Sequence, residues 1–413
     1  MPLDIAKIKA DFPIFAHTER NGRPLTYLDS AATSHKPKSV IDAEVKFYSE
    51  EYGTVRRGIY HLSAMATAQY EGVRNLIAEF INAASPTEIV YTRGTTEAIN
   101  IVASCYGESQ FRAGDQVLIS EFEHHSNLVP WLMLRDRIGI EIVYVRSTKD
   151  WRLDLDDLAT KLNSRVRLVA ITGMSNVLGT MPDLKAIGKL AHDNGSLFLV
   201  DGAQMVPHTG INVQFIDCDF LAFSSHKMLG PSGVGVLYMK RDLADKMLPW
   251  QGGGDMIESV FYDRFTSNGL PYKFEAGTPN MAGVIGFGKA IEYINAVGLV
   301  NLIMHERETT EYVLRRLLNT DGMEVYGPHS PANRGAVFSF NYKDLHSHDI
   351  GSMLDFYNIA IRAGHHCAQP LMGKLGVIST ARASFYLYNS KEEIDILLEA
   401  LVECERYLKH AVR

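Results

Sequence analysis

A lysine at position 227 lies in a polar cluster between two apolar runs of the sequence. The run FLAF is followed by Ser224, Ser225, His226 and Lys227, and a glycine-flanked apolar run comes next. Lysine seldom lies between buried strands without a partner. When a lysine amine is desolvated near other cations, its pKa falls from about 10.4 towards about 8, and it becomes usable for Schiff-base chemistry. The alternative is a surface lysine whose amine reaches solvent.

Polar residues also follow other apolar runs, where they could bind the same ligand. Asp201 follows LFLV, so its carboxylate could hold a protonated ring nitrogen or a metal ion, or it could cap the next helix. Gln204 could reach the same ligand or point to solvent. His124 follows QVLISEFE and could stack on a flat ligand or be a structural histidine. We expect no metal site, because no ligand set with metal spacing lies nearby.

The turn GTTE leads into a predicted helix, and the first turn of a helix binds anions through its free backbone N–H groups. The simpler interpretation of this turn is a helix cap. With Thr95, Ser224 and His226 at a phosphate, Lys227 at an aldehyde and Asp201 at a ring nitrogen, the residues together describe one ligand. Pyridoxal 5'-phosphate (PLP) carries all three groups and needs an acid beside its ring nitrogen.

One of the four cysteines lies in a stretch that favours reactivity. Cys367 is part of RAGHHCAQP, a predicted loop with histidine, glycine and proline. Cys105 and Cys404 lie at apparent helical positions and Cys218 precedes a predicted strand, so packing explains these three better. The wide spacing of the cysteines in a chain of this size argues against a disulfide framework.

The candidate residues follow short apolar runs that alternate with amphipathic stretches. The runs are predicted strands within 114–126, 165–176, 195–204, 218–227 and 233–241. Helices are predicted at 155–163 and 183–194. Strands that alternate with helices indicate βαβ units and a mostly parallel sheet, which binds ligands at the carboxyl ends of its strands. The predicted fold class is therefore α/β.

The sequence pattern changes after residue 285. Helices are predicted at 286–298, 305–319 and 391–412, and alternating strands at 334–342 and 380–389. We therefore predict a large PLP-binding α/β domain over 24–285. Residues 1–23 and 286–413 would form a smaller α+β domain that carries the cysteine loop. The stretch 248–280 is predicted to be a long irregular loop, of a kind that is often functional.

Composition limits the partners that the chain is expected to bind. It has 413 residues, of which 46% are hydrophobic and 22% charged, an ordinary balance for a globular protein. The net charge of -7 gives no reason to expect nucleic acid or an anionic membrane. No run approaches the roughly 18 apolar residues of a membrane span, and the first residues lack a secretory pattern. We expect a cytoplasmic protein.

Several stretches resemble one enzyme family in their order and spacing. They are LDSAATSHKP, TRGTTEAINIVA, EHHSNLVPW, SNVLGT, DGAQ, SSHKMLGPSGVGVLY, EAGTPN and IRAGHHCAQPLM. Over essentially its whole length, the chain resembles the class V aminotransferase group of the fold-type I PLP enzymes. Within that group it is most similar to the Suf-type (group II) cysteine desulfurases. The resemblance implies the PLP-dependent transferase (aspartate aminotransferase-like) fold.

The resemblance implies roles for the residues around the cofactor. Lys227 would carry PLP covalently, and Asp201 would pair with its pyridinium nitrogen. Gln204 would hydrogen-bond the ring oxygen and His124 would stack on the ring. A catalytic role is implied for Lys227, His124 and Cys367.

The resemblance also implies a homodimer with shared phosphate sites. Within one chain the phosphate would be held by Thr95, Ser224 and His226. The partner subunit would bring its Gly277 and Thr278 to the same phosphate.

For substrate binding, the resemblance implies Asn176, Arg362 and Arg382, since a guanidinium suits an α-carboxylate. The implied reaction converts L-cysteine to L-alanine through a PLP ketimine and transfers sulfur to Cys367 as a persulfide. Through this reaction the protein would supply sulfur for iron–sulfur cluster assembly. The implied partners are a SufE- or SufU-like sulfur acceptor and an iron–sulfur scaffold complex.

Two alternatives stay open at this point. The chain could be a selenocysteine lyase or another class V PLP enzyme in which Cys367 is not the sulfur acceptor, or a non-catalytic protein. One stretch departs from the family, which commonly reads VHRG followed by a second histidine. Here Arg56 replaces the first histidine, Tyr60 the second, and His61 comes one residue later. No role of those histidines can be carried over.

Overall fold

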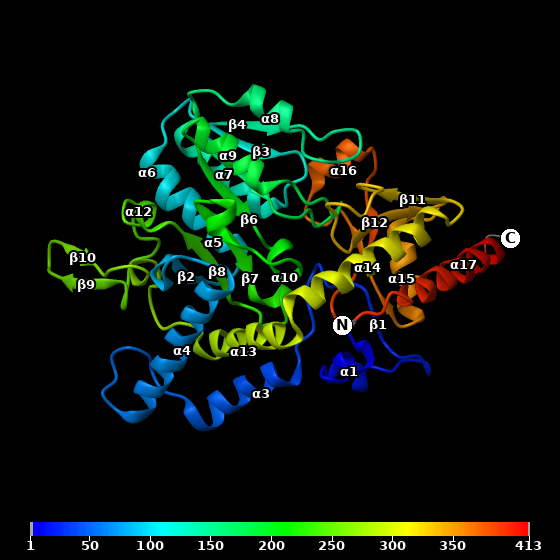
Figure 1. The fold of residues 1–413 in the computed structure, drawn as a ribbon, viewed down its shortest axis with the longest axis horizontal. Helices are drawn as coiled ribbons and strands as arrows, with labels where there is room; N and C mark the ends of the chain where they lie inside the picture. The colour runs from blue at the N-terminus through cyan, green and yellow to red at the C-terminus, as the bar shows by residue number, and fades with distance from the viewer. Residues whose placement is uncertain (1–2, 412–413) are drawn as a thin grey trace.

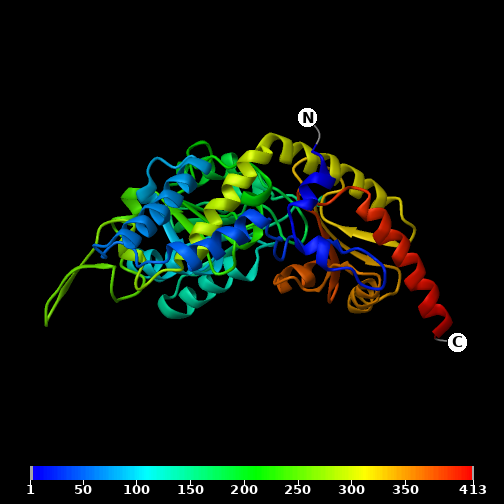
Figure 2. The same cartoon turned by 90° about the horizontal axis from the view of Figure 1, so that it is seen from below.

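The structure is a computed structural model that describes residues 3–411. It holds a seven-stranded sheet and a four-stranded sheet, each packed against helices (Figure 1). The two sheets lie in two lobes along the long axis of the molecule, and the N- and C-terminal helices both lie on the lobe of the smaller sheet (Figure 2).

The larger sheet has the strand order β2-β8-β7-β6-β5-β3-β4. Its strands are β2 (Ile89–Thr92), β3 (Gln116–Ser120), β4 (Glu141–Val145), β5 (Val166–Thr172), β6 (Leu197–Asp201), β7 (Phe220–Ser224) and β8 (Gly235–Met239). Strand β8 is antiparallel to β2 and β7, and the other ladders are parallel. The predicted α/β class with a mostly parallel sheet is confirmed.

The sequences of these elements explain why they form. Strand β7 is buried at every position, which suits its uninterrupted apolar run in a sheet covered on both faces. Helix α9 (Leu184–Asp193) buries Leu184, Ile187 and Ala191, three or four residues apart on one face. The side chain of Asp183 caps it by accepting the N–H of Ala186.

The remaining helices of this lobe surround the sheet. They are α3 (Lys38–Lys46), α4 (His61–Phe80), α5 (Thr95–Ile101), α6 (Glu108–Gln110), α7 (Val129–Ile138), α8 (Leu155–Lys161), α10 (Met205–His208), α11 (Val213–Ile216), α12 (Arg241–Ala244) and α13 (Met281–Val297). Helix α13 packs against α3 and α4 (Figure 1).

The smaller sheet is antiparallel, with the order β11-β12-β15-β14. Its strands are β11 (Met323–Tyr326), β12 (Val337–Tyr342), β14 (Arg362–Gly364) and β15 (Thr380–Ser384). The helices of this lobe are α1 (Ile5–Ala10), α2 (Ile14–His17), α14 (Leu299–Leu318), α15 (Ser347–Phe356), α16 (Gln369–Leu375) and α17 (Glu393–Ala411). Strand β1 (Thr26–Tyr27) pairs in parallel with β13 (Ile359–Ala360).

The division into domains at 23/24 and 285/286 stays a prediction. Residue 285 lies inside the continuous helix α13, and β1 pairs with a strand beside the smaller sheet although it falls within 24–285. Residues 1–2 and 412–413 of the predicted smaller domain lie outside the described residues.

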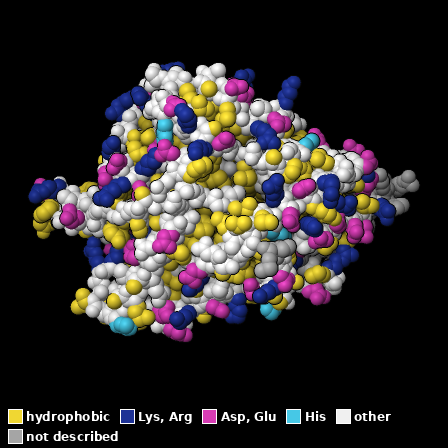
Figure 3. Space-filling view, in the orientation of Figure 1, with side chains coloured by type: hydrophobic (Ala, Val, Ile, Leu, Met, Phe, Trp, Pro, Cys, Tyr) yellow, Lys and Arg dark blue, Asp and Glu magenta, His cyan; other side chains and the backbone are white. Residues whose placement is uncertain are grey.

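The stretch 248–280 is not irregular throughout. It contains a hairpin of β9 (Ile257–Val260) and β10 (Phe265–Ser267), whose strands are too short to produce a clear alternating pattern. The hairpin projects from one end of the molecule and exposes hydrophobic and charged side chains, which Figure 3 shows at its left edge.

No single helix among residues 3–411 is both long and apolar enough to cross a membrane. Helices α13 and α14 pass that test only as a pair that bends by 76°. Within the same range, no group of three or more histidine, cysteine or acidic residues has an arrangement that could hold a metal ion.

Candidate active site

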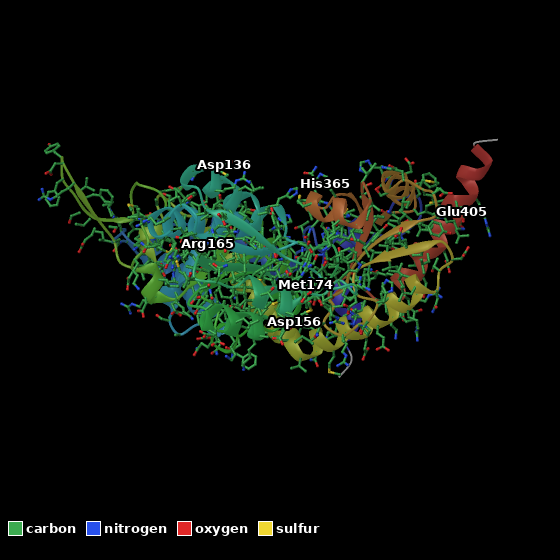
Figure 4. All side chains as sticks on the ribbon, turned by 90° about the horizontal axis from the view of Figure 1, so that it is seen from above. Asp136, Asp156, Arg165, Met174, His365 and Glu405 are labelled. Carbon is green, nitrogen blue, oxygen red and sulfur yellow. The ribbon has the colours of Figure 1, made fainter. Side chains whose placement is uncertain are left out.

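A cavity of about 230 Å³ lies where the carboxyl ends of the large-sheet strands face the smaller sheet. Met174, in its lining, lies at the junction of the two lobes, and His365 lies on the side of the smaller sheet (Figure 4). The cavity brings together every predicted site residue except Gly277 and Thr278. Those that line it are Thr95, His124, Asn176, Asp201, Gln204, Ser224, His226, Lys227, Arg362, Cys367 and Arg382.

Lys227 ends a short 3-10 turn that follows β7, and its side chain lines the cavity. Within the described part of the chain, its amine has no hydrogen bond or ion pair. Burial lowers the pKa of this amine to about 8, the Asp201 carboxylate opposes that shift, and the cations of Arg382 and Arg362 add to it. A large fraction of the amine is therefore neutral near pH 8, as nucleophilic or basic chemistry requires.

Asp201 ends β6, Gln204 follows three residues later, and both face the cavity. In the ladder between β5 and β6, Asp201 is level with Thr172, which also lines the cavity. Burial raises the pKa of the Asp201 carboxyl, so a cation placed beside it would be stabilised. Gln204 donates its Nε2 to the carbonyl of Ala31 at 2.6 Å. Its Oε1 is buried and has no partner among residues 3–411.

His124 has a ring that stays neutral. Its Nδ1 accepts the N–H of Ser126 at 3.0 Å, and burial together with the nearby Lys227 cation lowers its pKa to about 3. The preceding residue, Glu123, is buried and accepts hydrogen bonds from Asn127 Nδ2 and from the N–H of Thr172. These contacts hold the turn that carries His124 against the ends of β3 and β5.

Hydroxyl groups gather where β2 leads into α5. The Oγ atoms of Thr95 and Ser224 lie 2.7 Å apart, and Ser224 Oγ accepts the N–H of Thr95. The close approach of the backbone before Thr95 to strand β8 requires two glycines. A Cβ on Gly235 would lie 2.4 Å from Gly94 Cα, and Gly94 itself has φ 155°. His226 lies beside them, with Nδ1 3.2 Å from Thr33 Oγ1.

Two arginines lie directly opposite each other in the smaller sheet. Arg362 of β14 pairs in register with Arg382 of β15, and both line the cavity. Arg382 is 2% exposed; it donates to Asp29 at 3.0 Å and to the carbonyl of Asn176 at 3.1 Å. Its Nε is buried without a partner in the described range. Like charges across a ladder repel, so an anion between them would stabilise this pair.

Cys367 lies in a tight turn between β14 and α16. His366 and Cys367 have φ of 52° and 55°, which costs non-glycine residues about 1–3 kcal/mol each. The carbonyl of His366 accepts a hydrogen bond from Asn176 Nδ2 at 2.7 Å. The ring Nε2 of His366 lies 2.9 Å from Thr380 Oγ1. The half-buried Cys367 lines the cavity, whereas Cys105, Cys218 and Cys404 are buried elsewhere.

Residues 26–397 match the family model described as aminotransferase class-V. The chain belongs to the aminotransferase class-V family. A cysteine desulfurase of Shigella sonnei is 48% identical over 409 residues, which are 99% of this chain and 100% of that protein. The structure of the Escherichia coli cysteine desulfurase CsdA, in an S-sulfonic acid form, matches with a TM-score of 0.90 and 39% identity over 98% of this chain and 100% of that one.

A second solved structure, the apo cysteine desulfurase of Thermococcus onnurineus, matches with a TM-score of 0.91 and 38% identity over 98% of each chain. These similarities confirm the predicted resemblance to cysteine desulfurases. They also confirm the PLP-dependent transferase fold as the fold class.

Gly277 and Thr278 are separated from the other predicted residues of this class-V site. They line a second cavity, together with Trp250 and Asn280, and do not reach the cavity of Lys227 in the same chain. A phosphate role for them therefore depends on a second subunit.

Arg56, which departs from the family pattern, is part of a buried ion-pair cluster. Its Nη2 lies 2.6 Å from Glu275 Oε2, and Arg74 Nη1 lies 2.7 Å from Glu275 Oε1. The guanidinium of Arg56 also lies 4.2 Å from the ring centre of Tyr272. Tyr60, in contrast, is exposed. Arg56 thus has a packing role next to the segment that carries Gly277.

Sequence reasoning missed several residues of the site. Asp29 holds Arg382, Thr172 borders Asp201, and His366 lines the cavity. Asp29 belongs to LDSAATSHKP, a stretch used for the family resemblance without any role for its acid. The acid in that stretch could have marked Asp29 as a candidate site residue. The position of Thr172 beside Asp201 depends on strand register, which the sequence does not show.

Proposed function

We propose that this protein is a PLP-dependent cysteine desulfurase that converts L-cysteine to L-alanine and takes the sulfur on Cys367. One observation carries the proposal: Lys227, Asp201, the arginine pair and Cys367 line the same cavity. The identity to proteins named cysteine desulfurase over nearly the whole chain supports it.

The unpaired groups of the cavity fit PLP. The cofactor offers an aldehyde to the unbonded amine of Lys227 and a pyridinium to Asp201, whose buried carboxyl makes no ion pair within residues 3–411. It also offers a polar ring substituent to Gln204, whose Oε1 has no other partner in the described chain. Thr95, Ser224 and His226 would hold the phosphate. Bound PLP would store the electron pair released when the substrate loses its Cα proton.

The cysteine substrate would be oriented by its carboxylate. Arg382 keeps a free Nε–H and lies opposite Arg362, so the two guanidinium groups offer a binding site for one carboxylate. Asn176 packs beside them and holds the backbone of His366. With the carboxylate fixed there, the neutral amine of Lys227 removes the proton from Cα.

Sulfur transfer then takes place at Cys367. Its thiolate attacks the substrate sulfur, so that an S–S bond forms and the Cβ–S bond breaks. The electron pair of the broken bond stays on Cβ of the substrate, which takes up a proton. Cα takes back the proton held by Lys227, and the fragment leaves as alanine. Cys367 keeps the sulfur as a persulfide.

Assembly, partners and location follow as parts of the same proposal. Two copies would pair so that Gly277 and Thr278 of one chain reach the phosphate bound by the other. The persulfide would pass to a SufE- or SufU-like acceptor and then to an iron–sulfur scaffold complex. The four free cysteines support a reducing compartment, and hence the cytoplasm.

The test is incubation of the PLP-loaded protein with L-cysteine while alanine is measured. We expect Cys367→Ala to lower alanine formation by about a hundredfold or more, and the control Cys404→Ala to leave it nearly unchanged. Alanine formation by Cys367→Ala at the wild-type rate would refute the role of this thiol. Rates on selenocysteine and cysteine sulfinate, measured in parallel, test the alternatives of a selenocysteine lyase or another class V enzyme.

A further inference from the structure

Both backbone polar groups of Cys367 are bound by histidines. The N–H of Cys367 donates to His365 Nδ1 at 3.2 Å, and its carbonyl accepts the N–H of His125 at 2.8 Å. The ring of His125 holds the same segment again, because its Nε2 accepts the N–H of Gln369 at 3.1 Å. The turn is therefore attached to the loop after β3 at two points, one on each side of Ala368.

These contacts define which nitrogen of each ring is the acceptor. A ring nitrogen that accepts a backbone N–H carries no proton, so the accepting nitrogens are Nδ1 of His365 and Nε2 of His125. Burial and the neighbouring His365 lower the pKa of His125, which keeps its Nε2 available as an acceptor. The two ring centres lie 5.9 Å apart.

The turn needs such support because its backbone is strained. His366 and Cys367 both have φ in the left-handed region, and neither is glycine. A strained conformation persists only where surrounding contacts determine it. Without the two acceptors, the turn would relax and Sγ would leave its position at the cavity.

We infer that His125 and His365 are positioning residues, which hold the Cys367 thiol at the cavity by accepting backbone N–H groups through Nε2 and Nδ1 respectively. The inference rests on the proposed function and adds to it two residues that do not touch the substrate. It assigns a different nitrogen to each ring, and this difference can be tested.

The side-chain amides of asparagine and glutamine separate the two positions. An asparagine oxygen lies close to where Nδ1 of histidine lies, and it accepts the N–H two residues on, as in an Asx turn. A glutamine oxygen reaches about as far as Nε2. His365→Asn and His125→Gln should therefore restore the acceptor, whereas His365→Gln and His125→Asn place the same amide at the wrong distance.

The experiment uses the PLP-loaded protein and follows two steps separately. The absorbance change on adding L-cysteine reports events at Lys227, and mass spectrometry reports persulfide on Cys367. We expect His365→Gln and His125→Asn to slow persulfide formation about tenfold, the effect of one lost hydrogen bond, and to leave the absorbance change intact. His365→Asn and His125→Gln should stay within about twofold of wild type.

Equal persulfide rates for the asparagine and glutamine variants of one histidine would overturn the inference. It would also be overturned if His365→Gln and His125→Asn slowed the absorbance change as much as they slow persulfide formation. Alkylation by iodoacetamide without L-cysteine separates this result from a failure of the proposed function. The other three cysteines are buried, so alkylation reports Cys367. It should be several-fold faster in His365→Gln than in His365→Asn, whether or not the wild type forms a persulfide; equal alkylation rates would also overturn the inference.

Discussion

At the residue scale, the charges in the cavity control one another's protonation. Lys227 is surrounded by two guanidinium groups and one carboxylate, and burial favours its neutral form. His124 and His226 have lowered pKa values for the same reasons, burial first and the Lys227 cation second. The cavity therefore offers neutral rings, and an amine that is neutral in a large fraction near pH 8, to a ligand that brings its own phosphate and carboxylate charges.

The lowered pKa of Lys227 predicts how attachment of PLP depends on pH. Only the neutral amine attacks an aldehyde, and below about pH 8 its fraction falls about tenfold per pH unit. The rate at which apoprotein takes up PLP should therefore rise with pH and level off near pH 8, as followed by absorbance. In Asp201→Asn the curve should move to lower pH, because the carboxylate raises the pKa of the amine. A rate that still rises tenfold per unit above pH 9 would contradict this account.

Individual residues also show where sequence reasoning succeeds at this scale. Lys227, Asp201 and Thr95 could be chosen because each comes one to four residues after an apolar run, which puts them at one edge of the sheet. Asp29 could have been chosen from its stretch, but its pairing with Arg382 could not be predicted, because the two residues meet only after the smaller sheet has formed. The acceptor roles of His125 and His365 depend on single ring nitrogens, which no sequence pattern specifies.

At the element scale, a buried charge cluster supports the segment before Gly277. The Glu275 carboxylate forms ion pairs with Arg74 and Arg56. Each guanidinium also packs on a tyrosine ring; that of Arg74 lies 4.2 Å from the ring centre of Tyr91. The two guanidinium groups lower the pKa of the Glu275 carboxyl, so it remains a carboxylate inside the protein. Removing that charge would leave the two guanidinium groups to share the single carboxylate of Glu71, so one buried positive charge would be uncompensated.

Replacing Glu275 with glutamine should therefore destabilise the protein strongly. We expect Glu275→Gln to lower the free energy of unfolding by about 3–5 kcal/mol, as is typical when one partner of a buried ion pair is lost. Denaturation by urea measures this change. The matched control is Lys38→Ala, which breaks the exposed pair with Asp42 and should cost about 0.5 kcal/mol or less. A similar small loss for both variants would show that the cluster contributes little.

Elements differed in how well the sequence predicted them. Long periodic stretches such as α9 and fully apolar runs such as β7 were predicted correctly, because burial determines their pattern. The β9–β10 hairpin was missed, since each strand is short and both are largely exposed. The register that places Arg362 opposite Arg382 depends on pairing between distant segments, which a single sequence does not show.

At the scale of the whole molecule, the cavity lies between two lobes and contains only part of the phosphate site that we propose. Gly277 and Thr278 line a different cavity from Lys227, although both groups are assigned to one phosphate site. A symmetric dimer resolves this separation, because each subunit can supply its turn to the other. The function of the molecule would then depend on assembly.

Mixing two inactive variants tests this arrangement. Lys227→Ala removes the amine, and Thr278→Glu places a negative charge where the partner's phosphate would bind. After the two proteins are unfolded and refolded together, random pairing should restore about a quarter of the wild-type sites, since one site in each mixed dimer is intact. Alanine formation from L-cysteine measures the recovery. Absence of recovery, with mixed dimers shown by native mass spectrometry, would contradict a shared site.

The central claim is that the thiol of Cys367 receives the sulfur of L-cysteine within a cavity organised by Lys227. The most direct measurement is mass spectrometry of the peptide containing Cys367 after a single turnover of the PLP-loaded protein with L-cysteine. We predict one added sulfur atom on Cys367, in equal amount to the alanine released, and none in Lys227→Ala. Alanine released without added sulfur on Cys367, or sulfur on another cysteine, would contradict the claim.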